Sequence, residues 1–427
     1  MTRGQAASPG VSISRRAAER IRAGHVWVYR SDVVKATGIG RGAMVAVHGP
    51  GRRANPSEPG FLGTALYSSS SEIALRMISR GRVDDLKQLV RERIREAIAY
   101  RERFVESTNA YRVIFSEGDF LPGLIVDRYN DIVSLQVLTQ AMDSDEMREV
   151  SISELRAALN PAFIVERVDR RVQQLEQLPA RESGVIWPKA WPGRPPGGTG
   201  ETAIGAAGSP AAQPDRMTTK IKMNGISLLC DPLGGQKTGF FLDQRENYAR
   251  AARYARGEAL DVFCYQGGFA LHLSQVCDKV TGVDSSRQAL EIAERNATLN
   301  GKEIEWIEAN AFDLLRDYSD AGRRYDAIVL DPPAFAKSKR DLPTALRGYK
   351  ELNLRALKMI GRGGILVTCS CSYHASASDL VETVQSAALD SRRIIRILEN
   401  RGAAKDHPTV PGIPETAYLN CLILLVS

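Results

Sequence analysis

Cysteines and long apolar runs are both scarce in this sequence. Six cysteines occur in 427 residues, and no pair of Cys-x-x-Cys clusters is present, so neither a disulfide-stabilised scaffold nor a zinc site is expected. We predict no bound metal. No run of about 18 apolar residues occurs, which argues against a membrane-spanning helix, and the first residues lack the apolar stretch of a signal peptide. We therefore expect a soluble, cytoplasmic protein.

Positive charge exceeds negative charge in the chain. Lysine and arginine total 57 against 50 aspartate and glutamate, a formal net charge of +7, which favours an acidic partner such as RNA. The cations crowd the N-terminal region and alternate with aromatic residues, a combination that RNA-binding proteins use. They are Arg15, Arg16, Arg20, Arg22, Arg30, Arg41, Arg52 and Arg53, interleaved with His25, Trp27 and Tyr29. We predict RNA contacts by Arg15, Arg16, His25 and Trp27; a charged surface without a ligand is the alternative.

The length of the chain suits two or three domains, because single hydrophobic cores stop growing at about 250 to 300 residues. Residues 8–75 contain short β-like runs between Gly, Pro and Ser clusters, which fits a small β-barrel. Residues 76–185 mix helical and strand patterns, as in a compact α+β domain. Residues 186–217 are rich in Pro and Gly, so we expect a flexible insertion. Residues 218–427 alternate strands and helices, which predicts a mostly parallel α/β sheet with helices on both faces.

Hydrophobic periodicity predicts the approximate bounds of individual elements. Helices are expected over 84–104 and 144–159. Strands are expected over 27–29, 43–47, 62–67, 112–115, 123–127, 132–138, 163–166, 258–262, 279–283, 304–308 and 364–369, with another ending at Leu330.

A glycine-containing turn follows the strand that carries Asp261. Gly267 and Gly268 allow close approach of a ligand, and the helix that begins there offers free N–H groups. The next strand ends at Asp284, placed as an acid that holds ribose hydroxyls about 20 residues beyond such a turn. Phe263 and Tyr265 stand where dinucleotide-binding enzymes carry glycine. A pyrophosphate is therefore a poor fit.

Two later strands deliver a carboxylate and a thiol. One strand ends in Leu330 and is followed by Asp331-Pro-Pro, and another runs into Ser-Cys371-Ser. Ligands of open α/β sheets lie beyond the carboxyl ends of the strands, so both groups are placed for chemistry on a bound substrate. Cys371 is the candidate nucleophile. Cys369 lies on the same face of the extended segment and is the alternative.

These motifs together resemble the class I S-adenosylmethionine-dependent RNA methyltransferases. More narrowly, they are similar to the bacterial large-subunit ribosomal RNA cytosine-5 methyltransferases that carry an N-terminal PUA domain. The resemblance is carried by Asp-Val-Phe-Cys-Tyr-Gln-Gly-Gly-Phe, by Gly-Val-Asp-Ser-Ser, by Asp-Pro-Pro-Ala-Phe-Ala-Lys and by Cys-Ser-Cys-Ser. Gly-Gln-Lys-Thr-Gly-Phe-Phe-Leu-Asp-Gln-Arg and a late Asp-His-Pro add to it. The implied fold is a PUA domain, a central α+β domain and a Rossmann-like methyltransferase domain.

The resemblance implies S-adenosylmethionine as cofactor, large-subunit ribosomal RNA as partner, and a homodimer. Asp284 would bind the ribose, Asn310 and Ala311 would border the adenine, and Arg245 would help close over the methionine carboxylate. The full expected pocket is Lys237, Thr238, Arg245, Asp261, Phe263, Gly267, Gly268, Asp284, Asn310, Ala311 and Asp331.

Carbon 5 of cytosine is too weak a nucleophile to take a methyl group directly. A thiolate adding at carbon 6 makes carbon 5 reactive, and Cys371 would supply it. Asp331 would give N3 a proton or a short hydrogen bond as charge builds there.

The target base would meet the loop after Asp331. Pro332 and Pro333 stiffen that loop, and Phe335 offers a stacking face for a flipped-out base. Lys337 would activate the thiol or hold an RNA phosphate. Related multi-site enzymes carry a second cysteine where Ala334 stands. The group that removes the carbon-5 proton is therefore open, with His374 as one candidate.

Two other functions stay open at this stage. Asp-Pro-Pro also occurs in methyltransferases that act on nucleobase nitrogens, where no thiol is needed, so replacing Cys371 would spare activity. A non-catalytic RNA-binding or ribosome assembly factor is the third possible function. Loss of cofactor binding would distinguish such a factor from the two enzymes.

Overall fold

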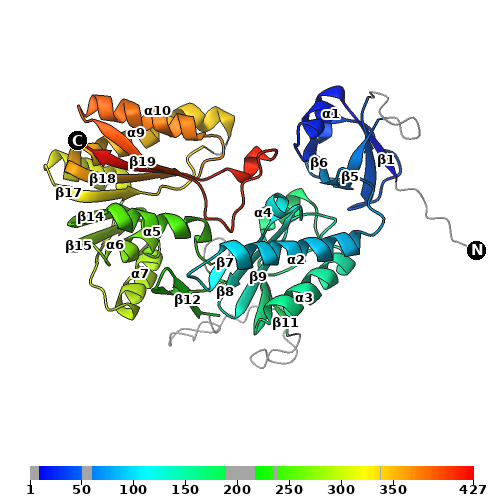
Figure 1. Cartoon of the computed structure of the whole chain (residues 1–427), viewed down its shortest axis with the longest axis horizontal. Helices are drawn as coiled ribbons and strands as arrows, with labels where there is room; N and C mark the ends of the chain where they lie inside the picture. The colour runs from blue at the N-terminus through cyan, green and yellow to red at the C-terminus, as the bar shows by residue number, and fades with distance from the viewer. Residues whose placement is uncertain (1–8, 51–59, 189–216, 235–238, 337) are drawn as a thin grey trace, which may run out of the picture. The chain divides into compact units, whose positions relative to one another are not determined.

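The computed structural model describes residues 9–50, 60–188, 217–234, 239–336 and 338–427 (Figure 1). They form two compact units. The first unit is Met1–Thr219 with Cys230–Phe240 and Pro411–Ile413, and the second holds Lys220–Leu229, Phe241–Val410 and Pro414–Ser427. Within the described part of the chain, no helix is both long and apolar enough to cross a membrane.

The first unit begins with a six-stranded sheet in the order β2-β6-β5-β4-β1-β3. Its pairs are antiparallel except β1 with β4, and buried valines such as Val28 and Val45 fill its core. Helix α1 starts after Ser14, whose Oγ accepts the Ala17 N–H at 3.2 Å. The elements are β1 (Gly10–Ile13), α1 (Arg15–Arg22), β2 (Trp27–Tyr29), η1 (Arg30–Asp32), β3 (Val33–Lys35), β4 (Met44–His48), β5 (Phe61–Tyr67) and β6 (Ile73–Ser79).

The first domain was expected to end at residue 75, but β6 continues to Ser79 and pairs with β5 and β2 along its length. The boundary therefore lies after this strand. Arg52 and Arg53 lie outside the described residues.

A five-stranded sheet, in the order β11-β10-β9-β8-β7, forms the centre of the first unit. Helices α2 and α3 pack together over it and bury Ile94, Val113 and Leu155 among other apolar side chains. The expected helices are present, and each begins after a side-chain cap, Asp85 for α2 and Ser144 for α3. The elements are α2 (Leu86–Phe104), β7 (Ala110–Phe115), η2 (Ser116–Asp119), β8 (Leu124–Tyr129), β9 (Ile132–Val137), α3 (Asp145–Leu159), β10 (Phe163–Glu166), α4 (Arg170–Leu175) and β11 (Gly184–Trp187).

The insertion was expected to begin at residue 186. Ile186 and Trp187 instead complete β11, which pairs antiparallel with β10. Residues 189–216 lie outside the described part.

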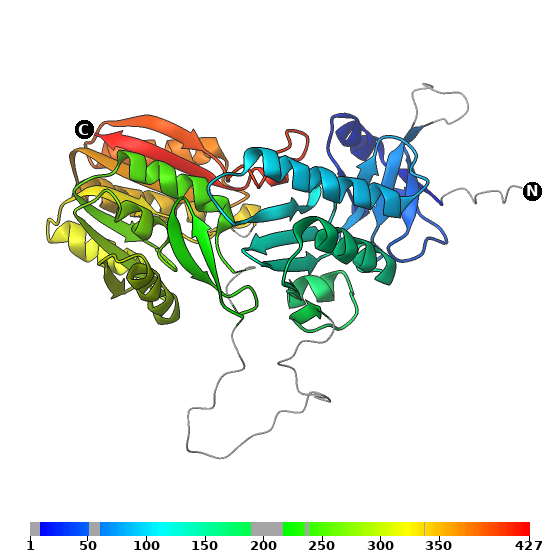
Figure 2. The same ribbon diagram turned by 60° about the horizontal axis from the view of Figure 1, so that its bottom comes forward.

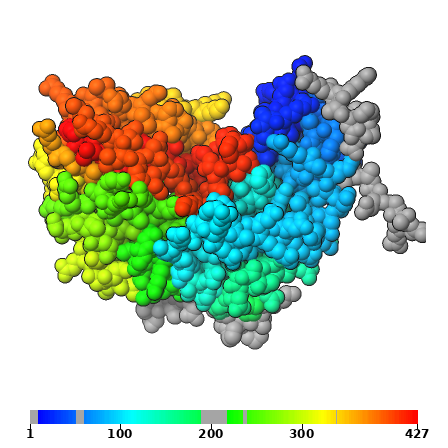
Figure 3. Space-filling model, in the orientation of Figure 1, coloured from blue at the N-terminus to red at the C-terminus, as the bar shows by residue number. Residues whose placement is uncertain are grey.

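Buried polar contacts join the six-stranded sheet to the central sheet. Glu176, which is 3% exposed, accepts hydrogen bonds from Ser68 at 2.6 Å and from Arg76 at 2.8 Å. Gln140 donates to the Glu176 carbonyl at 2.7 Å. Since a buried carboxylate without partners is costly, these contacts fix the two sheets against each other. In Figure 3 the surface of the N-terminal residues, in blue, continues without a break into the cyan surface of the residues that follow them in the same unit.

The second unit is built on a seven-stranded sheet in the order β16-β15-β14-β17-β18-β20-β19. The strands from β16 to β18 are parallel and β20 is antiparallel to both neighbours. Helices α9 and α10 cover one face, and α5, α6 and α7 lie on the other (Figures 1 and 2). The predicted α/β sheet with helices on both faces is confirmed.

The bounds of this part follow the sequence pattern closely, and a two-stranded sheet of β12 and β13 precedes it. The elements are β12 (Thr219–Met223), β13 (Ile226–Cys230), η3 (Leu242–Gln244), α5 (Arg245–Tyr254), β14 (Glu258–Val262), α6 (Gly268–Leu273), β15 (Lys279–Asp284), α7 (Arg287–Leu299), β16 (Glu305–Glu308), α8 (Ala311–Asp320), β17 (Tyr325–Leu330), η4 (Lys339–Asp341), α9 (Leu342–Met359), β18 (Ile360–Ser370), α10 (Ala377–Asp390), β19 (Ile395–Arg401), η5 (Pro414–Thr416) and β20 (Asn420–Val426).

The strand order reverses between β14 and β17. From β14 the chain proceeds to β15 and β16 on one side, then crosses to β17 and β18 on the other. Such a switch point opens a crevice at the carboxyl ends of the strands. Asp284 ends β15 at this edge, and the glycine turn, Asp331 and Cys371 directly follow β14, β17 and β18.

Candidate active site

The turn after β14 has an unusual backbone. Phe263, Tyr265 and Gly267 all have positive φ, at 67°, 48° and 86°. Residues other than glycine seldom adopt this backbone conformation. Asp284 supports this shape because its Oδ2 accepts the Tyr265 N–H at 2.9 Å. A Cβ at Gly268 would lie 2.5 Å from the Tyr248 ring, so only glycine fits there. The turn is therefore held in one conformation from two sides.

Asp284 is half-buried at the end of β15. Its Oδ1 accepts the Ser286 N–H and its Oδ2 the Tyr265 N–H, both at 2.9 Å. Each carboxylate oxygen has two lone pairs, so Asp284 has acceptor capacity beyond these two bonds. The Ala309 N–H donates to the Asp284 carbonyl at 3.1 Å, which brings the start of α8 beside it.

Asn310 and Ala311 stand at the start of α8. Asn310 is exposed and caps the helix, with Oδ1 accepting the N–H groups of Phe312 at 2.9 Å and Asp313 at 3.4 Å. Ala311 is buried. The two residues therefore directly follow the segment that bonds the Asp284 backbone, and the Asn310 side-chain oxygen caps α8.

Asp261 is fully buried in β14. Its Oδ2 accepts the Ala270 N–H at 2.8 Å, and its Oδ1 has no hydrogen-bond partner among the described residues. Burial raises the pKa of Asp261 well above its ordinary value, and the nearby carboxylates of Asp331 and Asp284 raise it further. A cationic ligand would relieve this carboxylate cluster, so the pocket fits a molecule with an ammonium and a sulfonium group.

Asp331 follows β17 and is held through its backbone and its side chain. Its N–H donates to the Val262 carbonyl at 3.3 Å, and its Oδ1 accepts from Gln244 Nε2 at 2.9 Å. Gln244 in turn accepts from Asn247 at 2.7 Å. Both amide residues are buried. Sequence reasoning missed Gln244, although it lies in the Phe-Phe-Leu-Asp-Gln-Arg segment.

Cys371 is the first residue beyond β18 and is half-buried. Its thiol donates to the Pro332 carbonyl at an Sγ–O distance of 3.7 Å, so it lies against the Asp-Pro-Pro loop. Cys369 is fully buried within β18, opposite Cys421. Burial raises the pKa of Cys369 well above its ordinary value. Of the two, Cys371 is the better placed nucleophile, since the thiolate is the reactive form.

The loop after Asp331 contains both buried and exposed residues. Pro332 is buried, Pro333 is exposed, and the half-buried Phe335 ring lies 4.8 Å from the Tyr349 ring and 6.0 Å from the Phe312 ring. Lys337 lies outside the described residues.

Arg245 is 2% exposed and contacts acids of the protein itself. Its guanidinium lies 3.4 Å from Asp406 and 3.6 Å from Glu246, and His407 lies 3.3 Å from Asp406. The late Asp-His-Pro motif is thus part of a buried charge cluster at the start of α5. Lys237 and Thr238 lie outside the described residues.

The N-terminal residues predicted to bind RNA differ in their surroundings. Arg15 and Arg16 are exposed on α1, where Arg15 pairs with Glu19 at 3.1 Å. Trp27 donates from Nε1 to Glu117 of the central part at 3.0 Å, and the His25 ring lies edge-on to it. The two arginines therefore lie at the surface. Trp27 is hydrogen-bonded to the Glu117 carboxylate.

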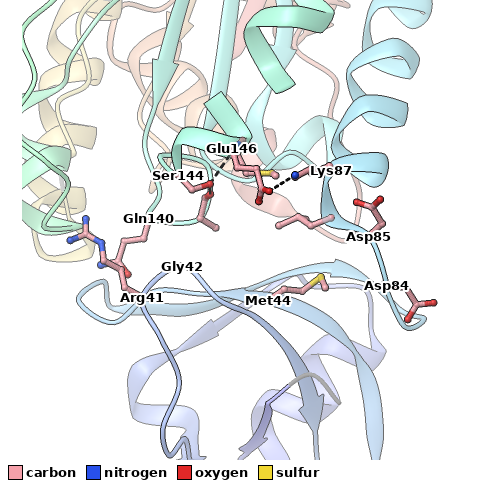
Figure 4. A pocket seen from close by; sticks show the side chains of 12 residues that line it. Arg41, Gly42, Met44, Asp84, Asp85, Lys87, Gln140, Ser144 and Glu146 are labelled. Carbon is pink, nitrogen blue, oxygen red and sulfur yellow. Dashed lines mark hydrogen bonds and ion pairs between the residues drawn. The ribbon is translucent and has the colours of Figure 1, made fainter. Parts of the chain in front are cut away.

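A cavity of about 600 Å³ lies in the first unit, between the six-stranded sheet and the starts of α2 and α3 (Figure 4). Lys87 points across it and pairs with Glu146. None of the residues predicted for the site lines it. Its lining mixes charges of both signs, and we assign no chemistry to it.

Known proteins are similar to this sequence over most of its length. A ribosomal RNA large subunit methyltransferase I from Tolumonas auensis is 37% identical over 373 residues, which span 85% of this chain and 87% of that protein. The protein of the same name from Aeromonas hydrophila is 34% identical over 409 residues, 94% of this chain and 95% of that protein. The chain belongs to the ribosomal RNA large subunit methyltransferase I family.

Two parts of the chain match known domain families. A PUA-like domain matches residues 11–80, and an S-adenosylmethionine-dependent methyltransferase domain matches residues 209–423. The interpretation of the motifs as those of an S-adenosylmethionine-dependent methyltransferase with an N-terminal PUA-like domain is therefore confirmed, together with its cofactor.

Solved structures agree on the fold. A SAM-dependent methyltransferase from Streptococcus mutans superimposes with a TM-score of 0.76 at 17% identity, covering 98% of this chain and 100% of that one. A methyltransferase complexed with SAH gives 0.77 at 16% identity over the same shares. The expected fold class, a PUA-like domain followed by a Rossmann-like methyltransferase domain, is confirmed.

Proposed function

We propose that this protein methylates carbon 5 of a cytosine in large-subunit ribosomal RNA, with Cys371 as the covalent nucleophile. The relatives' names point to the RNA, and the contact of the Cys371 thiol with Pro332 carries the mechanism. That contact sets a half-buried thiol beside the Asp331 loop, at the crevice where an open α/β sheet binds its ligands.

Cys371 would add to carbon 6 of the ring as a thiolate. The carbon–sulfur bond forms as the carbon 5–carbon 6 double bond opens, and carbon 5 becomes the nucleophile of an enamine. Carbon 5 would take the methyl group as the bond between that methyl and its donor sulfur breaks. Loss of the carbon-5 proton to a base would then restore the double bond and expel the thiolate. Ala334 is exposed and has no group to take that proton. His374, half-buried three residues beyond Cys371, is our candidate.

Asp331 would hold N3 of the cytosine while Cys371 adds. Negative charge develops on the N3 side of the ring during addition, and a proton or hydrogen bond from Asp331 offsets it. Gln244 supports this role because Asn247 donates to its oxygen, which leaves the Gln244 amino group to face Asp331. Asp331 Oδ1 therefore acts as an acceptor, and a proton on this carboxyl belongs to Oδ2.

S-adenosylmethionine, when bound, supplies a methyl group as an electrophile. Asp284 would accept the ribose hydroxyls, and Asp261 would face the positive end of the cofactor. The turn of Phe263, Gly267 and Gly268 would shape the wall between them. The same pocket would include Asn310, Ala311 and Asp331, with Lys237, Thr238 and Arg245 near the methionine carboxylate.

The RNA would contact the loop after Asp331 and the PUA-like domain. Pro333 and Phe335 would receive the flipped-out base, with Pro332 behind them and Lys337 near a phosphate. In the PUA-like domain, Arg15 and Arg16 would contact RNA phosphates. His25 and Trp27 would contact the RNA beside them. We place the enzyme in the cytoplasm with its substrate, and a homodimer stays a prediction of the family resemblance.

Mapping of modified nucleotides tests this proposal. Large-subunit ribosomal RNA from cells lacking the protein should lose one methyl group on a cytosine, measured by mass spectrometry. Expression of the wild type or of Cys277→Ala should restore it, and expression of Cys371→Ala should not. A lost methyl on a ring or exocyclic nitrogen, restored by Cys371→Ala, would contradict the thiol mechanism. An unchanged RNA would favour an assembly role.

A further inference from the structure

A buried tyrosine lies between the two loops that carry Asp331 and Cys371. Tyr349, on α9, is 1% exposed, and the two serines that flank Cys371 are fully buried. Ser370 donates to the Tyr349 hydroxyl at 3.1 Å, and the same hydroxyl lies 3.0 Å from Ser372 Oγ. One phenol therefore contacts the residue on each side of Cys371.

The contacts extend to the Asp-Pro-Pro loop. The Ala336 N–H donates to Ser372 Oγ at 3.3 Å, and the Phe335 ring packs on the Tyr349 ring. The direction of the hydrogen bonds is consistent, because Ser370 donates to the phenol oxygen and leaves the phenol hydrogen for Ser372. Burial raises the pKa of Tyr349 above its ordinary value, so the phenol keeps this hydrogen at neutral pH.

We propose that Tyr349 is a positioning residue that sets the Cys371 thiol relative to the Asp331 loop. This inference rests on the proposed role of Cys371. Ser370 and Ser372 are hydrogen-bonded to this phenol. The Asp-Pro-Pro loop reaches it through the Phe335 ring and through Ala336, which donates to Ser372. Without its hydroxyl the buried serines lose a partner, and the segment that aims the thiol can rotate. Misplacement of a reacting group by about 1 Å can cost about a hundredfold in rate.

Tyr349→Phe removes one oxygen and keeps the ring that packs on Phe335. The matched control is Tyr325→Phe. Tyr325 is also buried, and its hydroxyl is bonded to Arg323, but it begins β17, at the strand end opposite Asp331. Both variants lose a hydrogen-bonded phenol of the same sheet, and only one of these phenols reaches the catalytic loops.

Three measurements on the full-length protein follow. Single-turnover methyl transfer should fall about ten- to a hundredfold in Tyr349→Phe, while the affinity for S-adenosylmethionine, measured by calorimetry, stays at the wild-type value. Cys371 should react faster with iodoacetamide, because its thiol is less firmly held against Pro332. Peptide mass spectrometry reads this rate for each cysteine, with half-buried Cys277 as the internal reference.

Wild-type rates of both methyl transfer and Cys371 alkylation in Tyr349→Phe would overturn the proposal. An equal loss of methyl transfer in Tyr325→Phe would also overturn it, because the effect would then be general destabilisation. If Tyr349→Phe does not fold, Ser372→Ala carries the test, since it removes the link to Ala336. Methyl transfer by Cys371→Ala would instead refute Cys371 as the nucleophile. The rate of Cys371 alkylation in Tyr349→Phe would still show whether Tyr349 positions the thiol.

Discussion

Gln244 donates a hydrogen bond from Nε2 to Oδ1 of Asp331 over 2.9 Å. The bond joins η3, which precedes α5, to the end of β17, and both Gln244 and its partner Asn247 are buried. Asn247 is itself fixed by Arg401, which donates to Asn247 Oδ1 at 2.8 Å. The orientation of the Asp331 side chain thus depends on hydrogen bonds that run through Gln244 and Asn247 to Arg401, on the edge strand β19.

Replacing Gln244 with methionine should slow methyl transfer without abolishing folding. The substitution keeps the volume and removes the donor, and leaving an acceptor without its hydrogen-bond partner costs about 1 to 3 kcal/mol. We expect a loss of about ten- to a hundredfold in single-turnover rate. Gln288→Met, at an exposed position on α7, is the control. An unchanged rate in Gln244→Met would remove Gln244 from the mechanism.

Replacing Asp284 with alanine should weaken cofactor binding. The loss of a charged acceptor for ribose hydroxyls costs about 1.5 to 3 kcal/mol, equivalent to about ten- to a hundredfold in affinity. Asp284 also supports Tyr265, so Asp284→Asn, which keeps one acceptor oxygen, should lose less. Calorimetry with S-adenosylmethionine measures both, with exposed Asp278→Ala as the control. Equal affinity in all three variants would refute this pocket.

His272 should make the second unit sensitive to acid. Burial lowers the pKa of His272 from 6.5 to about 4, and its neutral ring donates to the Gly268 carbonyl and accepts from Asn224. The unfolded chain therefore takes up this proton first as pH falls. The free energy of unfolding should drop between pH 6.5 and 4, by up to about 1.4 kcal/mol per pH unit from this group.

Urea titrations across this pH range measure that slope. His272→Gln should show a shallower decline than the wild type, whatever its stability at neutral pH. An identical slope in the two proteins would show that His272 is protonated equally in the folded and unfolded states.

The exposed arginines of α1 should contribute to RNA binding through charge alone. Each lost phosphate contact should reduce the slope of log K against log salt by about 0.7 to 0.9, so Arg15→Ala/Arg16→Ala should flatten the slope and leave cofactor affinity unchanged. Arg287→Ala removes a similarly exposed arginine paired at i, i+4 and is the control. A wild-type salt slope in the double variant would place the RNA elsewhere.

Point substitutions are preferable to deleting the PUA-like domain. Deletion would strip Glu176 of Ser68 and Arg76, and breaking a buried pair costs about 3 to 5 kcal/mol. Weaker RNA binding by such a truncation would therefore not distinguish lost contacts from a damaged central sheet.

The sequence predicted the parts of the site that follow from local pattern. Buried parallel strands read as apolar runs. Asp284 at the end of one strand, and Asp331 and Cys371 just after two others, could therefore be located from the sequence. Helices α2 and α3 were also predicted within two residues, because their caps and apolar spacing are local.

Contacts between distant segments could not be predicted in this way. Gln244 lies 87 residues from Asp331 in sequence, and Tyr349 lies 21 and 23 residues from its serines. Arg245 and its partner Asp406 are 161 residues apart. Trp27 and Glu117 are 90 residues apart. No periodicity marks such pairs, because their meeting depends on the packing of whole elements.

The covalent role of Cys371 is tested most directly by RNA that carries 5-fluorocytosine at the target position. Fluorine does not leave as a proton does, so the methylated adduct cannot release the enzyme. We predict a protein–RNA band that survives denaturing electrophoresis, requires S-adenosylmethionine, persists in Cys369→Ala and disappears in Cys371→Ala. Methylation of the normal RNA with no trapped band would contradict the thiol mechanism, and a band that depends on Cys369 would transfer the role to that residue.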